Sequence, residues 1–195
     1  MSEAAAIAAA DIDRVRELVS VGAGHAATAL AGLTGRTCEM SVPTVRLAGD
    51  RPAPEPESDL SGVLFELEGG TGGVLALLFS GATCERLLEH LLGPGHGTGH
   101  ADSVAQSALR EVGNILASHA ANAVGEMLGT PVLPSVPLLA LDDAPTALAN
   151  LLALRHGAEP PLRIEAEICD RAHELRGILV LVPDTIRRVA PAAAF

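Results

Sequence analysis

The pattern of apolar and polar positions predicts two long amphipathic helices. Over residues 11–33 the apolar side chains recur at helical spacing: Ile12, Val15, Val19, Leu30 and Leu33. Asp11 or Asp13 is suited to cap the start of this helix, and Gly35 is suited to end it. The second helix runs from a cap at Asp102 or Ser103 to Gly129. Its apolar stripe, which we expect to face the core, comprises Val104, Ala108, Val112, Ile115, Ala123 and Met127.

Strand-like segments follow each long helix. Residues 38–47 and 132–141 alternate as strands do, and each contains a proline, Pro43 or Pro137, which belongs at a sheet edge or a bulge. Apolar runs on either side of turn residues predict two hairpins. Their strands are 60–67, 73–79, 162–169 and 174–182.

Shorter helices complete the pattern. One is expected over 82–92 behind a cap at Ser80, and the other over 144–154 with Pro145 in its first turn. Asp184 is placed to cap a terminal turn.

The chain repeats itself at a shift of 94 residues. The matches that are least expected by chance pair Arg16-Glu17 with Arg110-Glu111, His25 with His119, Gly35 with Gly129, and Ser41-Val42-Pro43 with Ser135-Val136-Pro137. A repeat of this length indicates a duplicated supersecondary unit rather than a solenoid. We therefore expect one domain over 1–195, with halves at about 11–92 and 102–190 and a Gly-rich linker at 93–101. The predicted fold class is α+β, a six-stranded sheet arrangement in two pseudo-symmetric halves with long helices packed on it.

A polar stripe runs along the second helix. Ser107, Glu111, Asn114 and Ser118 fall within roughly 60° of one another, because spacings of three and four residues nearly complete a turn. On the residues alone this is an ordinary solvated helix face, although Asn is a mediocre helix former. The repeat draws attention to it, since the first helix has Ser20 where the second has Asn114.

Composition excludes several classes of function. The formal net charge of −11 removes the positive surface that binding to a phosphate backbone needs. With three Phe and no Trp or Tyr, the chain also lacks aromatic platforms for stacking on single-stranded bases, so we expect no nucleic-acid partner. Cys38, Cys84 and Cys169 are odd in number and far apart, as is typical of reduced thiols in a cytosolic protein.

Neither a metal site nor a membrane segment is predicted. His90, His96 and His100 cluster around the linker, but nothing fixes their geometry, and a Gly-rich linker with incidental histidines is the simpler interpretation. We expect His25 and His119 to pack against the apolar sides of their helices. The N-terminus has no secretory signal pattern, and residues 18–35 are too weakly apolar to cross a bilayer. The expected location is the cytoplasm.

The Glu-x-x-Asn pair at Glu111 and Asn114 suggests one kind of chemistry. An amide can both donate to and accept from a single water, so it can orient that water for attack without changing its own protonation. The Gln of GTPases positions water for attack on a phosphoryl group in this way. The neighbouring carboxylate is better placed to bind a partner's cation than to act as an isolated base. Such a site needs a phosphoryl group from elsewhere.

The spacing of these residues resembles the CheC/CheX/FliY family of chemotaxis phosphatases. The family motif is [Asp/Ser]-x-x-x-Glu-x-x-Asn, then twenty-two residues, then Pro, and the second copy fits it with Ser107, Glu111, Asn114 and Pro137. The first copy has Asp13, Glu17 and Pro43 at the same spacing, with Ser20 in place of Asn. The resemblance covers roughly residues 11–185, and the two-copy form looks most like CheC.

The resemblance implies hydrolysis of the aspartyl phosphate on a CheY-type response regulator. Glu111 would pair with a lysine of the regulator, and Asn114 would orient the attacking water. Mg²⁺ would sit on the regulator, with no cofactor bound by this chain. CheD, the receptor deamidase, is a further partner that the resemblance implies. Ser20 is too short to present an amide, so we expect the site at Glu17 and Ser20 to be weak or inactive. A non-catalytic adaptor that binds a response regulator or a CheD-like protein is the alternative, and a structural role in a flagellar switch is a weaker third.

Overall fold

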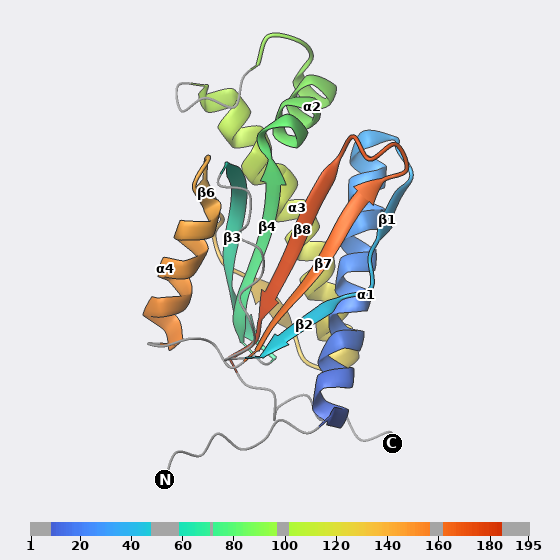
Figure 1. Cartoon of the computed structure of the whole chain (residues 1–195), viewed down its shortest axis with the longest axis vertical. Coiled ribbons are helices and arrows are strands. Elements are labelled where there is room, and N and C mark those ends of the chain that lie inside the picture. Colours follow the sequence, from blue (N-terminus) through green and yellow to red (C-terminus); the bar gives the residue numbers. More distant parts are fainter. Residues whose placement is uncertain (1–8, 48–58, 71, 97–101, 157–161, 185–195) are drawn as a thin grey trace.

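Four helices and eight antiparallel strands make up the described part of the computed structural model, which comprises residues 9–47, 59–70, 72–96, 102–156 and 162–184 (Figure 1). In chain order they are α1 (Ala9–Thr34), β1 (Cys38–Met40), β2 (Thr44–Leu47), β3 (Leu60–Gly69), β4 (Gly73–Ser80), α2 (Gly81–Leu92), α3 (Ser103–Leu128), β5 (Val132–Pro134), β6 (Leu138–Ala140), α4 (Ala144–His156), β7 (Leu162–Asp170) and β8 (Arg176–Val182). The sheet order is β1-β7-β8-β4-β3-β5, with β2 also paired to β7 and β6 to β3.

The sheet has helices on both faces, and each face has its own apolar cluster. α1 and α3 lie side by side behind the sheet in Figure 1, and together with α2 they enclose the larger cluster, which includes Val19, Leu116 and Phe65. The two long helices approach closely at Gly22, where a Cβ would lie 3.2 Å from the side chain of Val124. α4 covers the other face over β3 and β4 and closes a smaller cluster.

The two halves exchange strands. β1 and β2 of the first half pair with β7 of the second, whereas β5 and β6 of the second half pair with β3 of the first. The two hairpins meet at the centre of the sheet, where β4 pairs with β8. The predicted pseudo-symmetry is therefore present, and the short strands of each half complete the sheet of the other.

Each Ser-Val-Pro triplet forms a β-bulge. Residues 41–43 lie between β1 and β2 and face only 166–167 of β7. Residues 135–137 lie between β5 and β6 and face only 65–66 of β3. One extra residue on the outer strand breaks the ladder in each half at the same place. This corrects the prediction of six strands, because each proline-containing strand is divided in two.

The serine of each triplet secures the bulge. Ser135 donates its backbone N–H to the carbonyl oxygen of Glu66 at 2.8 Å, and its hydroxyl accepts the N–H of Glu66 at 3.0 Å. Ser41 makes the same two contacts with Glu167, at 2.8 and 2.9 Å. The hydroxyl takes the place of a backbone acceptor that the bulge displaces. This shared role accounts for the repeated serine.

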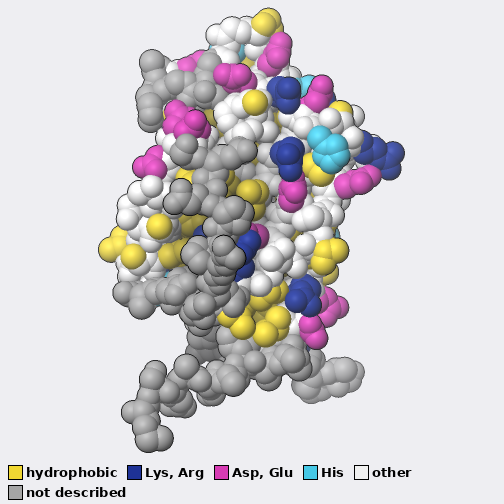
Figure 2. Space-filling model, in the orientation of Figure 1, with side chains coloured by type: hydrophobic (Ala, Val, Ile, Leu, Met, Phe, Trp, Pro, Cys, Tyr) yellow, Lys and Arg dark blue, Asp and Glu magenta, His cyan; other side chains and the backbone are white. Residues whose placement is uncertain are grey.

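The half of the outer sheet face beyond α4 carries ion pairs. Arg176 binds Glu167 at 2.6 Å, and Glu165 lies 3.5 Å from Arg46 and 2.6 Å from Arg163. Figure 2 shows basic and acidic side chains close together on the right of this face. These charged side chains make this half of the face unsuitable for packing under an apolar helix.

Most predicted elements are confirmed. Ser80 caps α2 and accepts the N–H of Thr83, while the hairpins and α4 lie where the pattern indicated. The cap at Asp11 or Asp13 is wrong, because α1 already includes Ala9. The terminal turn after Asp184 lies outside the described residues.

Candidate functional site

The polar stripe of α3, which we call the α3 stripe, faces solvent as predicted. Ser107 and Glu111 are exposed, and Asn114 and Ser118 are half-buried. The helix that carries them is fixed at both ends. At its start the carboxylate of Asp102 accepts the N–H of Ala105 at 2.9 Å.

The caps of α3 are well formed. Hydrogen bonds from the Ala105 backbone, followed by the contact with His96 at 3.1 Å, lower the pKa of Asp102 below its usual range, so it stays ionised at the positive end of the helix dipole. At the far end Gly129 adopts the left-handed conformation with φ 64°. The stripe is thus presented on rigid backbone.

Glu111 and Asn114 are available to an outside partner. In the part of the chain that the structure describes, neither side chain makes a hydrogen bond or an ion pair. Arg110, the nearest cation in sequence, instead reaches back to Gln106 at 3.4 Å. A carboxylate and an amide one turn apart, both unused by the fold, can therefore contact a cation and a water of a bound partner.

Gly113 sets the depth of Asn114, and sequence reasoning missed it. A Cβ at Gly113 would lie 2.6–2.8 Å from three side-chain carbons of Val63 on β3, so only glycine fits. Val63 pairs across the sheet with Leu139 of β6. The Asn114 segment therefore lies directly over the edge of the sheet, beside the strand that follows Pro137. A glycine directly before the key asparagine was the available signal.

Pro137 belongs to the bulge between β5 and β6. It is half-buried beside Val136, the extra residue of the bulge, which is 88% exposed. The motif proline thus shapes the sheet edge next to the helix.

Val104 was assigned to the core stripe, and this is wrong. Its side chain is 53% exposed. It lies seven residues before Glu111, which is two helical turns, so it extends the α3 stripe toward the helix start. The buried side of α3 is formed instead by residues that include Ala105, Leu109, Val112 and Leu116.

The first copy presents a matching α1 stripe of Asp13, Glu17, Ser20 and Gly24. Asp13 and Glu17 are exposed and Ser20 is half-buried. Asp13 binds Arg16 at 3.0 Å, whereas Glu17 and Ser20 have no hydrogen-bond or ion-pair partner among the described residues. Pro43 is buried in its bulge. The two copies thus differ at the asparagine position and agree at the glutamate.

The histidines do not form a site. His25 and His119 are exposed, which corrects the expectation that they pack against apolar surface. Within the described ranges no group of three or more His, Cys, Asp or Glu side chains is arranged to hold a metal ion. His100 lies outside those ranges.

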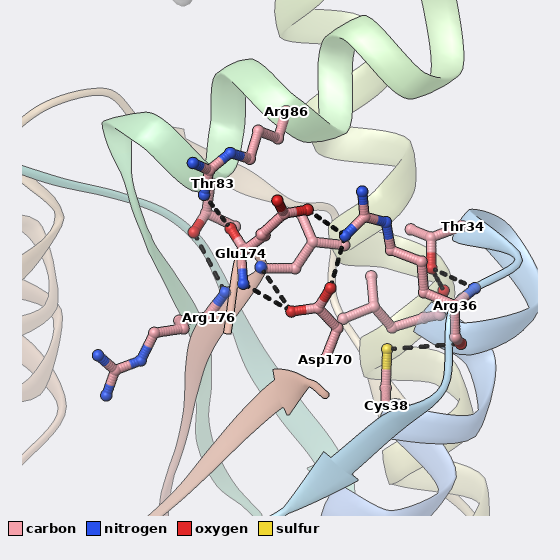
Figure 3. A network of polar contacts seen from close by, with 10 residues as sticks. Thr34, Arg36, Cys38, Thr83, Arg86, Asp170, Glu174 and Arg176 are labelled. Atoms are coloured by element: carbon pink, nitrogen blue, oxygen red, sulfur yellow. Dashed lines mark hydrogen bonds and ion pairs between the residues drawn. The ribbon is translucent and has the colours of Figure 1, made fainter. Parts of the chain in front are cut away.

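A second polar cluster, shown in Figure 3, joins three elements rather than forming an open site. Buried Asp170 at the end of β7 binds Arg36 at 2.6 Å and accepts the backbone N–H groups of Glu174 and Leu175 at 2.7 and 3.0 Å. Arg86 of α2 donates to the carbonyl oxygen of Glu174 at 2.6 Å. Since these groups satisfy one another, the cluster holds the β7–β8 turn to α2 and to the end of α1.

These features are similar to those of known proteins. The CheC-like family model matches residues 15–47 and 104–139, which are the helix–bulge units of the two halves. CheC of Bacillus subtilis strain 168, described as a CheY-P phosphatase, is 27% identical over 184 residues, covering 89% of this chain and 88% of that protein. The chain is thus similar to CheC-like proteins in both of these segments. Both Glu111 and Asn114 fall inside the second matched segment, and Glu17 and Ser20 inside the first.

Solved structures agree with the CheC-like fold. FliY of Thermotoga maritima superposes with a TM-score of 0.67 at 18% identity, covering 94% of this chain and 96% of that one. CheX of Borrelia burgdorferi, in a complex with CheY, BeF₃ and Mg²⁺, superposes with a TM-score of 0.58 at 13% identity, covering 86% and 97%. None of the described helices of this chain has the length and apolar character needed to span a bilayer.

Proposed function

We propose that this CheC-like chain is a phosphatase for the aspartyl phosphate of a CheY-type response regulator, with its chemistry on the α3 stripe. The observation that carries the proposal is the pair of unused side chains, Glu111 and Asn114, on a helix fixed at both ends. The description of Bacillus subtilis CheC as a CheY-P phosphatase and the solved CheX–CheY complex support the choice of partner.

In the proposed mechanism the regulator supplies the phosphoryl group and Mg²⁺, and this chain supplies orientation. Glu111 binds a cation of the regulator and so sets the position of the helix over the acyl phosphate. The Asn114 amide accepts a hydrogen bond from one water and donates to it, which holds the water in line with the phosphorus–oxygen bond that breaks. Water attacks phosphorus, the aspartate leaves as a carboxylate, and inorganic phosphate is released.

The α1 stripe is proposed to contribute little turnover. Ser20 carries a hydroxyl that can bind water, but its side chain is one bond shorter than that of an asparagine and cannot reach as far into a partner. A CheD-like deamidase remains a second proposed partner on the strength of the family resemblance alone. Under the adaptor alternative, the same surface would bind the regulator without accelerating hydrolysis.

The test is the dephosphorylation rate of phosphorylated Bacillus subtilis CheY with Mg²⁺. Wild-type chain is expected to accelerate it, and Asn114→Ala to reduce the acceleration by about 10²-fold, as loss of a positioned catalytic contact does. Glu111→Ala should weaken both binding and rate. Matched controls lie on the same helix: Asn122→Ala and Glu126→Ala remove exposed side chains of the same types farther along α3.

Wild-type activity that survives in both Asn114→Ala and Glu111→Ala would place the chemistry elsewhere. Binding of phosphorylated CheY with no acceleration by wild type would favour the adaptor.

A further inference from the structure

One residue of β3, Glu66, holds the bulge beside the α3 stripe. β5 and β6 each form only three residue pairs with β3, and residues 135–137 interrupt the ladder between them. Leu133 and Leu138, on either side of the bulge, are 58% and 52% exposed, so burial holds these short strands less firmly than the central ones. The two hydrogen bonds between Ser135 and Glu66 bridge the gap. The place of the bulge therefore depends on where Glu66 lies.

The side chain of Glu66 is bound to α4. Arg155, in the last turn of that helix, donates Nη1 to the Glu66 carboxylate at 2.5 Å. The same guanidinium donates Nε and Nη2 to the two carboxylate oxygens of Asp184, just past β8, at 2.6 and 2.7 Å. The Arg155 side chain is only 24% exposed, so salt and water weaken these contacts less than they weaken a fully exposed pair. One arginine thus fixes α4, β3 and the end of β8 to one another.

The first half of the chain provides a natural comparison. There Glu167 of β7 makes the same two hydrogen bonds with Ser41, at 2.8 and 2.9 Å, but its carboxylate binds Arg176 of the neighbouring strand β8. The cation that binds Glu167 therefore comes from the sheet itself, whereas the cation that binds Glu66 comes from a helix. The half that carries Asn114 is thus the one whose bulge is fixed to the outer helix.

This contact reaches Asn114 through the strand that supports its helix. Glu66 lies three residues along β3 from Val63, the side chain against which Gly113 of α3 packs. Leu139, the cross-strand partner of Val63, lies two residues beyond the bulge. Because packed interiors transmit small displacements, a bulge that shifts also moves the surface under Gly113. The depth of Asn114 changes with it.

We propose that Arg155 is a positioning residue for the α3 site: through Glu66 it keeps the bulge and the adjoining part of β3 in place beneath Asn114. The inference rests on the proposed function of the α3 stripe. α4 lies on the outer face of the sheet and α3 on the opposite face, so neither Arg155 nor Glu66 contacts a regulator bound at the stripe (Figure 1). Their loss should therefore lower kcat and leave KM unchanged.

The experiment measures kcat and KM for the dephosphorylation of phosphorylated Bacillus subtilis CheY with Mg²⁺ by the full-length chain. Arg155→Ala and Glu66→Ala should each lower kcat by about tenfold, because a displacement of 1 Å at a reacting centre costs about 10²-fold and the loss of one contact displaces it by less. The double variant should be no slower than Arg155→Ala, since both changes remove the same contact. Glu66→Gln keeps an acceptor for Arg155 and should keep most of kcat.

The controls are Glu167→Ala and Arg176→Ala, which remove the corresponding pair of the first half and should keep full kcat. A second readout does not depend on turnover. The amides of Glu66 and Ser135 donate the two hydrogen bonds of the bulge, so their hydrogen exchange, followed by NMR, should be faster in Arg155→Ala than in wild type. The same amides should exchange at the wild-type rate in Arg176→Ala.

Equal kcat in Arg155→Ala and Arg176→Ala would overturn the inference and leave the proposed phosphatase intact. A rise in KM alone would also overturn it, because Arg155 would then belong to the docking surface. Wild type that does not accelerate hydrolysis would refute the proposed function, and the inference with it, whatever the amides show.

Discussion

Replacing Gly113 with alanine should move α3 off the sheet. The new methyl group would start 2.6, 2.7 and 2.8 Å from the Cβ and both methyl carbons of Val63, where carbon atoms in contact normally lie about 3.5–4.0 Å apart. Val63 cannot turn away, because its χ1 is restricted and all three of its side-chain carbons are involved. The helix must therefore retreat by about 1 Å.

Two effects of opposite sign set the stability of Gly113→Ala. Overpacking of a dense core costs about 1–3 kcal/mol, and exchanging glycine for alanine within a helix returns about 1 kcal/mol. The net loss of up to about 2 kcal/mol should lower Tm by up to about 8 °C for a chain of this size. A displacement of 1 Å at a reacting centre costs about 10²-fold in rate, so turnover should fall far more than stability does.

Gly32→Ala is the matched control. Gly32 lies in α1, is exposed, and a Cβ there meets nothing within 4 Å, so this variant should gain up to about 1 kcal/mol and keep full turnover. The assays are thermal unfolding and the CheY dephosphorylation rate of both variants. If Gly113→Ala were as stable and as active as Gly32→Ala, the packing of α3 on β3 could not be what sets the position of Asn114.

Three further changes test other parts of the molecule. Adding Ser20→Asn to Asn114→Ala should restore part of the dephosphorylation rate, and no recovery would mean that the α1 stripe differs in more than its amide. Burial acts to raise the pKa of Asp170, but the N–H of Leu175 and the Arg36 guanidinium outweigh it and the pKa falls below its usual range. Such a carboxylate stabilises the fold above about pH 4 and stops doing so as pH falls through its folded pKa. Asp170→Asn should therefore lower the free energy of unfolding by urea by about 2 kcal/mol at pH 7, and the difference from wild type should disappear in acid. A difference that stays constant with pH would contradict this. Burial raises the pKa of the Cys84 thiol to about 12, so a thiol reagent at pH 8 should label it only on unfolding, and fast labelling of folded protein would refute its burial.

The sequence was informative wherever a pattern is local. Helical spacing predicted both long helices and the outward α3 stripe. Capping chemistry predicted Ser80, Gly129 and a cap at Asp102 or Ser103, of which the structure uses Asp102. The prolines gave only a hint that residues 38–47 and 132–141 would each form two short strands. The extra residue in each bulge shows only when the strand pairs with a hairpin of the other half. No local sequence pattern contains that pairing.

The errors share a physical cause. Val104 stands four residues before Ala108 and seven before Glu111, so spacing alone allowed it on either stripe. What decides is which side of α3 the neighbouring elements cover: Ala105 is buried in the core, whereas the adjacent Val104 stays exposed. His25 and His119 likewise lie on the uncovered sides of their helices. Gly113 was overlooked because its role depends on Val63, a residue far away in the chain.

The exchange of strands between halves also governs the order in which the molecule can form. During synthesis at about 5–20 residues per second, β1 and β2 emerge several seconds before β7, the strand that they need. Throughout that interval they are an unpaired edge, which is the kind of segment that seeds aggregation. Pro43 lies at the break between β1 and β2, where it cannot donate to a foreign ladder. The triplet that shapes the mature sheet edge would thus also protect the nascent chain while it waits for its partner.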